Sequence, residues 1–439
     1  MKNTKGITLV ALVITIIIML ILAGISIQAI TQTNLFKKAE QAKEETEQAQ
    51  EKENEMLSNY IDSMNEYLPD TLADKLAEEL SRVYSIYCLK NFNCILHHNI
   101  DKLYIGGGLF VMKKNKITKI NPIRVELNGR VSNTMNGKKI DLEKLFVPVI
   151  KEYLSTVIPR LNPETDLNII INCTQYSKRE FWYTPRNIND VPDSGKLFAA
   201  DTALCVNHST KTFCERLTFE LEQSFWNYNE KGYASPKFSK IGQDIKVMVS
   251  RIHNDIVATV CMPVYKDVYS THEEYNNIIK FHEARLTKIA NHMNFDKKYN
   301  INIEINRLPD GAYRNYSLVV GSCIECGEEG IVGRGNNSQG LISSFREHTV
   351  EAPCGKNPRY HTGRIVNFLA NNATSRIFEE LGVKCTLYSL TRNRGSIIRP
   401  FLFYLSVDDL TKKEECIRII KEEFDEKKFK GILNVRKLF

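Results

Sequence analysis

Two glycine-rich turns dominate the segment 321–363. The first turn spans residues 327–336 and reads Gly-Glu-Glu-Gly-Ile-Val-Gly-Arg-Gly-Asn, and the second spans 355–358 and reads Gly-Lys-Asn-Pro. Glycine adopts backbone conformations that other residues avoid, and it lets backbone amides approach an anion closely. Arg334 and Lys356 add positive charge to the two turns. The segment is therefore a candidate site for a phosphate-bearing ligand.

The flanking sequence places these turns between a strand and a helix. The apolar run 316–320 predicts a strand, and Ile365, Leu369 and Ile377 keep helical spacing after the second turn. The glycine spacing matches neither a Walker loop nor a dinucleotide-binding fingerprint, which argues against both of those folds. A loop with several glycines is more often an ordinary turn, so this pattern alone assigns no function.

Length and composition narrow the class of protein. The 439 residues are enough for two or three domains. The net charge of +7 is not concentrated in one basic run, which is compatible with an anionic small molecule and argues against a nucleic-acid partner. Cys323 and Cys326 are the one close pair among eleven cysteines, and they lack the second pair of a zinc site. We expect them at a buried strand end, in a protein of a reducing compartment.

Apolar periodicity predicts an α/β fold with no evident internal repeat. A helix is expected to begin at Pro69, a favoured first-turn residue, with Leu72, Leu76 and Leu80 on one face. Further strands are expected at 123–127, 167–172 and 256–264, and further helices at 145–157, 214–226 and 412–426.

The ordered motifs resemble the archaeal-type methionine adenosyltransferases, also called S-adenosylmethionine synthetases. The family block Gly-Asp-Asp-Gly-Ser-Val-Gly-Arg-Gly-Asn stands here as residues 327–336. Matching elements lie at 69–70, 96–101, 197–202, 242–248, 327–336, 340–342, 351–352, 355–358 and 361–365. The resemblance covers about residues 67–407. It implies an α/β (α+β) fold built from three similar α/β lobes.

The resemblance also implies roles for individual residues. The cations that neutralise the triphosphate of ATP would be Lys356, Arg334 and Lys246. Mg²⁺ would be held by Asp70, Glu328 and Asp201. ATP would be bound by Gly327, Gly330, Gly333, Gly335, Asn336, Gly355, Asn357, His98 and Asp101, with backbone amides of the glycine turns cradling the triphosphate. The family also uses K⁺, takes ATP and methionine as substrates, and forms homodimers with sites between subunits.

Several positions depart from the family pattern. Leu68 stands in place of a histidine that helps catalysis at the triphosphate end, and Tyr67 replaces the glycine before it. The bulkier residues around Gln175 replace a glycine-bearing segment, and a family glycine-rich loop is not recognisable at 113–116. Asp74 and Glu78, by contrast, match the family's helix.

Residues 7–30 form a nearly unbroken apolar run, long enough to cross a bilayer as a helix. The start, Lys-Gly-Ile-Thr-Leu at 5–9, resembles type IV prepilins, although Ala11 replaces the acidic residue of that family. Residues 31–66 are rich in Glu, Lys and Gln without a sustained apolar heptad, which favours an exposed helical linker over a coiled coil. We therefore expect a prepilin-like transmembrane helix (1–30), a charged helical linker (31–66) and a methionine adenosyltransferase-like domain (67–439).

Three functional hypotheses follow. The first is a single-pass membrane protein whose cytoplasmic head forms S-adenosylmethionine from ATP and methionine, releasing pyrophosphate and phosphate. The second is a catalytically divergent or inactive homologue that binds a nucleotide or S-adenosylmethionine. The third is a pilin-like structural subunit, which the scattered cysteines disfavour because export exposes thiols to oxidation.

Overall fold

The computed structural model describes residues 61–66, 68–176, 180–191, 198–336, 339–343 and 346–429. They belong to one compact unit, Ile61–Phe439. The expected transmembrane helix, the prepilin-like start and nearly all of the charged linker lie outside the described residues. No helix within the described part of the chain is long and apolar enough to cross a membrane.

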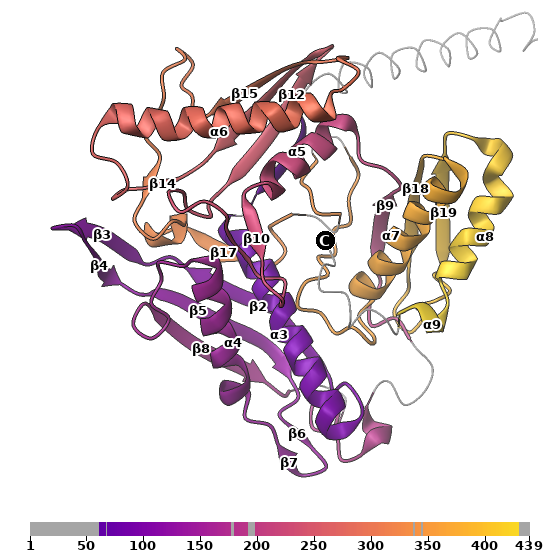
Figure 1. The fold of residues 1–439 in the computed structure, drawn as a ribbon. Helices are drawn as coiled ribbons and strands as arrows, with labels where there is room; N and C mark the ends of the chain where they lie inside the picture. The colour runs from indigo at the N-terminus through magenta and orange to yellow at the C-terminus, as the bar shows by residue number, and fades with distance from the viewer. Residues whose placement is uncertain are drawn as a thin grey trace, which may run out of the picture. The chain divides into compact units, whose positions relative to one another are not determined.

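The first lobe is a four-stranded sheet, and two helices pack on it (Figure 1). The strand order is β17-β2-β5-β8, with β5 antiparallel to β2 and parallel to β8. Its elements are α3 (Pro69–Phe92), β2 (His98–Gly106), β5 (Ile123–Val131), α4 (Leu142–Val157), β8 (Leu167–Thr174) and β17 (Glu329–Ile331).

The second lobe repeats this arrangement. Its sheet has the order β1-β12-β13-β15, with β13 antiparallel to β12 and parallel to β15. Its elements are β1 (Ile61–Glu66), α5 (Phe213–Gln223), β12 (Lys246–Ile252), β13 (Asp255–Cys261), α6 (His272–Met293) and β15 (Asn300–Ile305).

The third lobe is a smaller version, with the strand order β19-β18-β9. Both neighbouring pairs are antiparallel, and α7 packs on β9 and β18 while α8 packs on α7. Its elements are β9 (Leu204–His208), α7 (Thr362–Leu381), β18 (Cys385–Leu390), β19 (Leu402–Val407) and α8 (Lys413–Glu423).

The three lobes share a construction, although no internal repeat is evident in the sequence. In the first two, the chain runs helix, strand, strand, helix, strand with the same pairing of the strands. In each lobe the first helix packs on an edge strand supplied by another part of the chain: β17, β1 and β9. The expected mixed α/β fold is confirmed. The repeat is invisible in the sequence because only the pairing of the elements, not their residues, is alike.

Short hairpins and helices complete the described chain. The hairpins are β3 (Leu109–Lys113) with β4 (Lys116–Asn121), β6 (Thr134–Met135) with β7 (Lys138–Lys139), and β10 (Trp226–Tyr228) with β11 (Ala234–Pro236). The parallel pair is β14 (Val264–Tyr265) with β16 (Ser317–Leu318). The short helices are η1 (Ile188–Asp190), η2 (Cys323–Glu325), η3 (Leu410–Lys412) and α9 (Glu426–Phe429).

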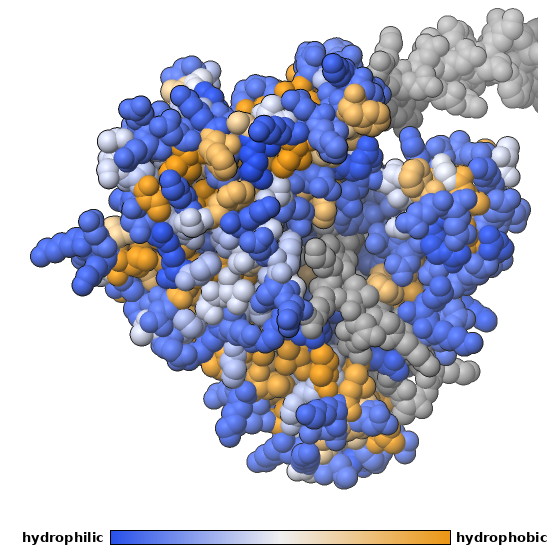
Figure 2. Space-filling model, in the orientation of Figure 1, coloured by the Kyte–Doolittle hydropathy of each residue, from blue (hydrophilic) through white to orange (hydrophobic). Residues whose placement is uncertain are grey.

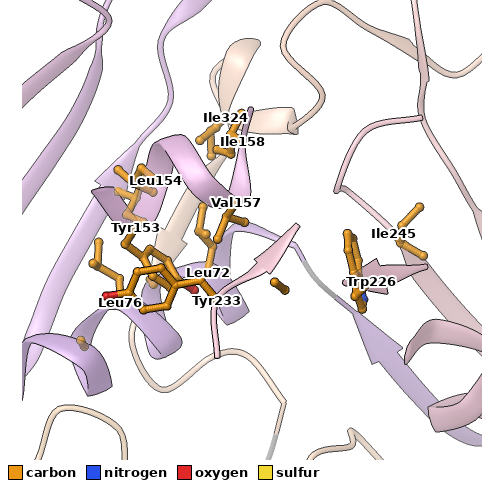
Figure 3. Close-up of a cluster of buried hydrophobic side chains, with 14 of the residues drawn as sticks. Leu72, Leu76, Tyr153, Leu154, Val157, Ile158, Trp226, Tyr233, Ile245 and Ile324 are labelled. Atoms are coloured by element: carbon orange, nitrogen blue, oxygen red, sulfur yellow. The ribbon is translucent and has the colours of Figure 1, made fainter. Parts of the chain in front are cut away.

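Buried apolar side chains form one core through the first two lobes and another in the third. Leu72 and Leu76, predicted on one face of the helix after Pro69, are buried in the first core. Figure 3 shows them near Tyr153 of α4 and near Tyr233. Burying a leucine side chain contributes roughly 2 kcal/mol, so this face fixes α3 against the rest of the lobe.

Several expected boundaries differ from the structure, and four of them change the interpretation of a segment. Residues 61–66, expected as the end of a helical linker, form β1 and pair antiparallel with β12, because a sheet edge offers partners that local composition does not predict. The helix expected at 214–226 ends at Gln223 before β10 begins. The strand expected at 256–264 stops at Cys261, since Pro263 has no amide to donate. That at 316–320 shrinks to β16.

The expected buried strand end for the close cysteine pair is wrong. Cys323 begins η2, and Cys326 after it is exposed. A tight turn places them there: the Cys323 amide donates to Asp244 Oδ2 at 3.0 Å, and the Tyr316 hydroxyl donates to the same oxygen at 2.7 Å.

Candidate functional site

The N-terminal half of α3 is the platform on which both glycine turns are held. Pro69 occupies the first helical position, and Leu68 at the N-cap makes no side-chain cap. Asp70, Asp74 and Glu78 follow at intervals of four residues, so they lie along one face of the helix. This stripe of carboxylates faces the two turns.

The first glycine turn donates its amides to this stripe. The Ile331 amide donates to Asp70 Oδ1 at 2.8 Å. The amides of Gly333 and Gly335 donate to the two oxygens of Asp74, at 2.7 and 3.2 Å. Burial is the main reason that the pKa of Asp74 rises to about 7, although these two hydrogen bonds act in the opposite direction. The turn is thereby fixed on α3 at three successive points.

Close packing against the helix explains why this turn needs glycine. A Cβ atom on Gly330 would lie 2.1 Å from the Pro69 carbonyl oxygen, and one on Gly335 would lie 2.6 Å from Asp74 Oδ2. Gly333 has a φ of +96°, which favours glycine. The backbone amides of the glycine turns were predicted to cradle a triphosphate; in this structure the amides of Gly333 and Gly335 donate to Asp74. The sequence showed the glycines but not the carboxylate that they face.

Arg334 lies between two carboxylates at the exposed edge of the turn. Its Nη1 is 3.0 Å from Glu329 Oε1 and its Nε is 3.5 Å from Asp70 Oδ2, while 55% of its side chain remains exposed. Glu329, rather than the predicted Glu328, supplies the second carboxylate; Glu328 is exposed. Of the three predicted cations, Arg334 is thus on the surface beside the turn, within reach of a ligand.

The second glycine turn contacts α3 further toward the C-terminus of the helix than the first turn does. The Gly355 amide donates to Glu78 Oε2 at 3.2 Å, and Gly355 has a φ of +72°. The Lys356 side chain is only 9% exposed, and its Nζ forms an ion pair with Glu351. Asn357 is fully buried and donates to the Leu96 carbonyl at 3.0 Å. These contacts give the second turn a structural role. They also mean that Lys356, which was predicted to bind phosphate, is paired with a carboxylate of the protein.

His98 and Asp101, predicted to shape the nucleotide pocket, lie on β2. His98 is fully buried, with Nε2 2.8 Å from the Ser81 hydroxyl, and burial lowers its pKa to about 3. Asp101 pairs with Lys102 at 2.7 Å. His98 is therefore a neutral core residue that connects β2 to α3 and lies beside Asn357.

Two predicted residues lie in other lobes. Lys246 begins β12 of the second lobe, opposite Cys261. Asp201 precedes β9 of the third lobe, where its Oδ1 accepts the Thr202 amide at 2.7 Å. The structure thus gathers the residues of the two glycine turns, together with Asp70 and His98, around α3. Asp201 reaches the start of α7 instead, where its backbone amide lies 3.4 Å from the Thr362 hydroxyl.

The predicted metal ligands do not assemble within one chain. Among the residues that the structure describes, no three His, Cys, Asp or Glu side chains are grouped so that they could hold a metal ion. Mg²⁺ in nucleotide sites is often held by one or two carboxylates together with substrate phosphates. Asp70 and Glu329 meet that smaller requirement, since both already face one cation, Arg334. This pair, not the set with Glu328 and Asp201, fits Mg²⁺ arriving with a nucleotide.

Sequence reasoning missed the acidic partners of the site. Asp74 and Glu78 were noted only as matches to a family helix, Glu329 was passed over for its neighbour, and Glu351 was not considered as a partner for Lys356. The spacing of four between the α3 carboxylates was the available signal. No sequence pattern predicts the ion pair between Glu351 and Lys356, because the five-residue segment that connects them is irregular and its conformation depends on tertiary structure.

Comparison with known proteins gives consistent matches. The family model described as S-adenosylmethionine synthetase (AdoMet synthetase) matches residues 43–432. An S-adenosylmethionine synthase of Saccharolobus islandicus is 30% identical over 340 residues, covering 76% of this chain and 80% of that protein. An uncharacterized protein of Streptococcus pyogenes serotype M3 is 31% identical over 359 residues, covering 81% and 87% respectively.

A solved structure titled as an unusual S-adenosylmethionine synthetase from Campylobacter jejuni is similar in part. It has a TM-score of 0.47 and 14% sequence identity, and the match covers 87% of this chain and 94% of that one.

Proposed function

The chain belongs to the S-adenosylmethionine synthetase family, and from that membership we propose that it transfers the adenosyl group of ATP to methionine. The observation that carries the proposal is the half-exposed Arg334, held beside a glycine turn by Asp70 and Glu329. A cation fixed next to carboxylates and exposed to solvent suits a ligand that brings both phosphate and Mg²⁺.

The chemistry of this transfer suits a site without a strong base. The methionine sulfur attacks C5′ of the ribose, a new C–S bond forms, and the C–O bond to the triphosphate breaks. A thioether is nucleophilic without losing a proton, so the protein has to orient the two substrates and stabilise the leaving group. The family then hydrolyses the triphosphate to pyrophosphate and phosphate.

Arg334 would stabilise the charge that develops on the leaving triphosphate. Lys356 would join it only by exchanging Glu351 for phosphate, because the two side chains are paired. Lys246 would contribute if the second lobe of a partner chain closes on the turn. Mg²⁺ held by Asp70 and Glu329 would supply further positive charge at the phosphates, and K⁺ is proposed from family usage alone.

A homodimer is proposed because the first and third lobes leave one sheet face open. In β8 and β19 exposed residues alternate with more buried ones along the whole strand. On β19 the open face includes Leu402 and Tyr404, which are 52% and 61% exposed. Apolar residues on an open sheet face suit pairing with a second copy. Light scattering of the full-length protein tests this: a monomer at micromolar concentration contradicts it.

Membrane attachment remains a proposal from the sequence. The apolar run 7–30 would anchor the protein as a single-pass helix, and a cytoplasmic head would have access to ATP and methionine. Fractionation of cells, with protease added from outside, tests both parts. Protein recovered in the soluble fraction contradicts the anchor, and digestion of the head in intact cells contradicts the orientation.

A second function is favoured by two observations at the site. Leu68 stands where the family has its histidine, and the Gly333 and Gly335 amides are taken by Asp74. Both features remove groups that would act on the triphosphate. A homologue that binds ATP or S-adenosylmethionine without transferring the adenosyl group is the alternative function. A pilin-like structural subunit is a weaker alternative, because the eleven cysteines are scattered singly along the sequence and export would expose them to oxidation.

One assay separates these functions. Full-length protein is given ATP, methionine, Mg²⁺ and K⁺, and S-adenosylmethionine is measured for the parent, Arg334→Ala and Leu68→His. The control is Arg418→Ala, an arginine in an exposed pair on α8. Turnover in the parent and control but not in Arg334→Ala supports the enzyme. Turnover only in Leu68→His indicates a disabled enzyme. Nucleotide binding without turnover in any variant leaves the binding protein.

A further inference from the structure

A groove of about 870 Å³ runs along α6 in the second lobe, and none of its lining residues belongs to the candidate site. Its walls are the segments 237–240 and 267–270 together with the N-terminal half of α6. Ligand pockets typically have volumes of 300–1,000 Å³. Figure 2 shows hydrophobic residues interrupting the hydrophilic surface in the region where Figure 1 draws α6. The groove is thus large enough for a small organic ligand.

One wall of the groove is aromatic. Phe238 and Phe281 lie with their ring centroids 6.3 Å apart, and both rings meet His282 edge-on, at 4.8 and 5.1 Å. Phe281 is 59% exposed and lines the groove, so part of its ring is open to solvent. A flat ring placed against this wall would cover the exposed phenylalanine and gain aromatic contact.

His282 is one of the residues that line the groove, and one of its ring nitrogens has no partner among the described residues. The residue is only 2% exposed, and its Nδ1 is buried without a hydrogen bond to any described group. Leaving a buried polar atom unpaired costs about 1–3 kcal/mol. A ligand atom that donates to or accepts from this ring would remove that cost.

The electrostatics of the groove favour an anion. Lys237 and Lys240 line it, and neither has a carboxylate within 4 Å in the described part of the chain. The two acidic residues in the lining form their closest contacts elsewhere, although Lys240 also acts electrostatically on Glu274 and helps to lower its pKa. Asp267 binds Arg160 at 2.7 Å, and Glu274 accepts the Ser270 amide at 2.6 Å as part of the α6 cap.

A third cation lies behind the aromatic wall. The Arg285 guanidinium stacks between Phe225 and Phe238, with its Cζ 4.4 and 4.8 Å from the ring centroids. It donates to the Ser224 hydroxyl at 2.7 Å, but its Nε and Nη2 are buried without partners among the described residues. Desolvation lowers its pKa to about 10. An anion in the groove would offset the cost of this poorly compensated charge.

We propose that this groove binds a small planar aromatic anion, with its ring against Phe238 and Phe281, its acidic group at Lys237 and Lys240, and a polar ring atom at His282. The ligand class is a single fused ring system carrying one carboxylate, sulfate or phosphate group. This is a second ligand site, separate from the glycine turns, and it does not depend on the proposed adenosyl transfer.

Equilibrium dialysis of the full-length protein with 4-methylumbelliferyl sulfate tests the proposal, with uncharged 4-methylumbelliferone as the comparison probe. We expect saturable binding of one sulfate ester per chain, and weaker binding of the neutral probe. The double variant Lys237→Ala/Lys240→Ala should weaken binding of the ester roughly tenfold or more, because two charge-assisted contacts are lost. Lys288→Ala, an exposed lysine further along α6, is the matched control and should have little effect.

His282→Phe tests the polar contact independently of the lysines. We expect weaker binding of the ester, by roughly threefold to tenfold, with no loss of stability against urea, since the variant removes an unpartnered buried nitrogen. Unchanged affinity in both the lysine double variant and His282→Phe would overturn the proposal. Equal binding of the two probes, or an absence of saturable binding, would also overturn it.

Discussion

Arg364 of α7 and Glu78 of α3 form a two-point ion pair although 286 residues separate them in the chain. Arg364 is 2% exposed, and its Nη1 also donates to the Lys356 carbonyl at 3.0 Å. Glu78 in turn accepts the Gly355 amide. This pair therefore connects the first and third lobes and fixes the second glycine turn between them.

Removing Glu78 should destabilise the protein strongly. We expect Glu78→Gln to lower the free energy of unfolding by about 3–5 kcal/mol, because the buried Arg364 guanidinium loses its counter-charge. Urea denaturation followed by circular dichroism measures the effect. Glu422→Gln, which removes an exposed carboxylate shared by Arg418 and Arg376, is the control and should cost less than about 1 kcal/mol. A loss of similar size in both variants would contradict the special role of the buried pair.

Gly335→Ala should displace the first glycine turn from α3. Its Cβ would lie 2.6 Å from Asp74 Oδ2 and 2.9 Å from the Thr71 Cα. We expect lower stability and, by calorimetry, weaker ATP binding, because Arg334 next to it would move. Gly311→Ala serves as the comparison: Gly311 has a φ of +83° but nothing within 4 Å of an added Cβ. That variant should show a cost of about 1 kcal/mol from the backbone alone, with ATP binding unchanged.

The pairing of Lys356 with Glu351 predicts opposite effects of two substitutions on ATP affinity. Glu351→Gln should tighten ATP binding roughly threefold or more, because the lysine no longer has to give up a carboxylate before it meets phosphate. Lys356→Ala should weaken binding. Glu380→Gln, which removes an exposed partner of Arg376, controls for the change in net charge. Isothermal titration calorimetry at two salt concentrations distinguishes direct contact from long-range attraction; weaker binding by Glu351→Gln would rule out this exchange.

His98 should make stability fall as the pH decreases. Burial holds its pKa at about 3 in the folded chain, whereas an unfolded histidine titrates near 6.5. Below pH 6.5 His98 is protonated in the unfolded chain but stays neutral in the folded chain. The free energy of unfolding therefore declines by at most about 1.4 kcal/mol per pH unit until the pKa of the folded state is reached. His98→Gln should show a shallower decline between pH 6.5 and 5, measured by urea denaturation. An equal slope in both proteins would mean that other groups carry the dependence.

Local sequence predicted the elements that carry their own signals. The helix after Pro69 was predicted from its apolar spacing, and Leu72, Leu76 and Leu80 on that face are all buried. The strands at 123–127 and 167–172 were predicted for the same reason: apolar periodicity records which face of an element is buried. Strand β1 was missed, because an edge strand takes its conformation from the sheet that it joins.

The sequence by itself determined the family, because motifs in the family order extend over most of the chain. They are recognisable even where the predicted bounds of helices and strands are inaccurate. It also located the two glycine turns and Arg334. The tertiary structure decided what these residues contact. The Gly333 and Gly335 amides donate to Asp74, Lys356 pairs with Glu351, and the lysines of the α6 groove form no ion pair within 4 Å among the described residues. The glycine spacing indicates that the backbone of the turns closely approaches another group. Only the packing of α3 against the turns specifies whether that group is a phosphate or a carboxylate of the protein.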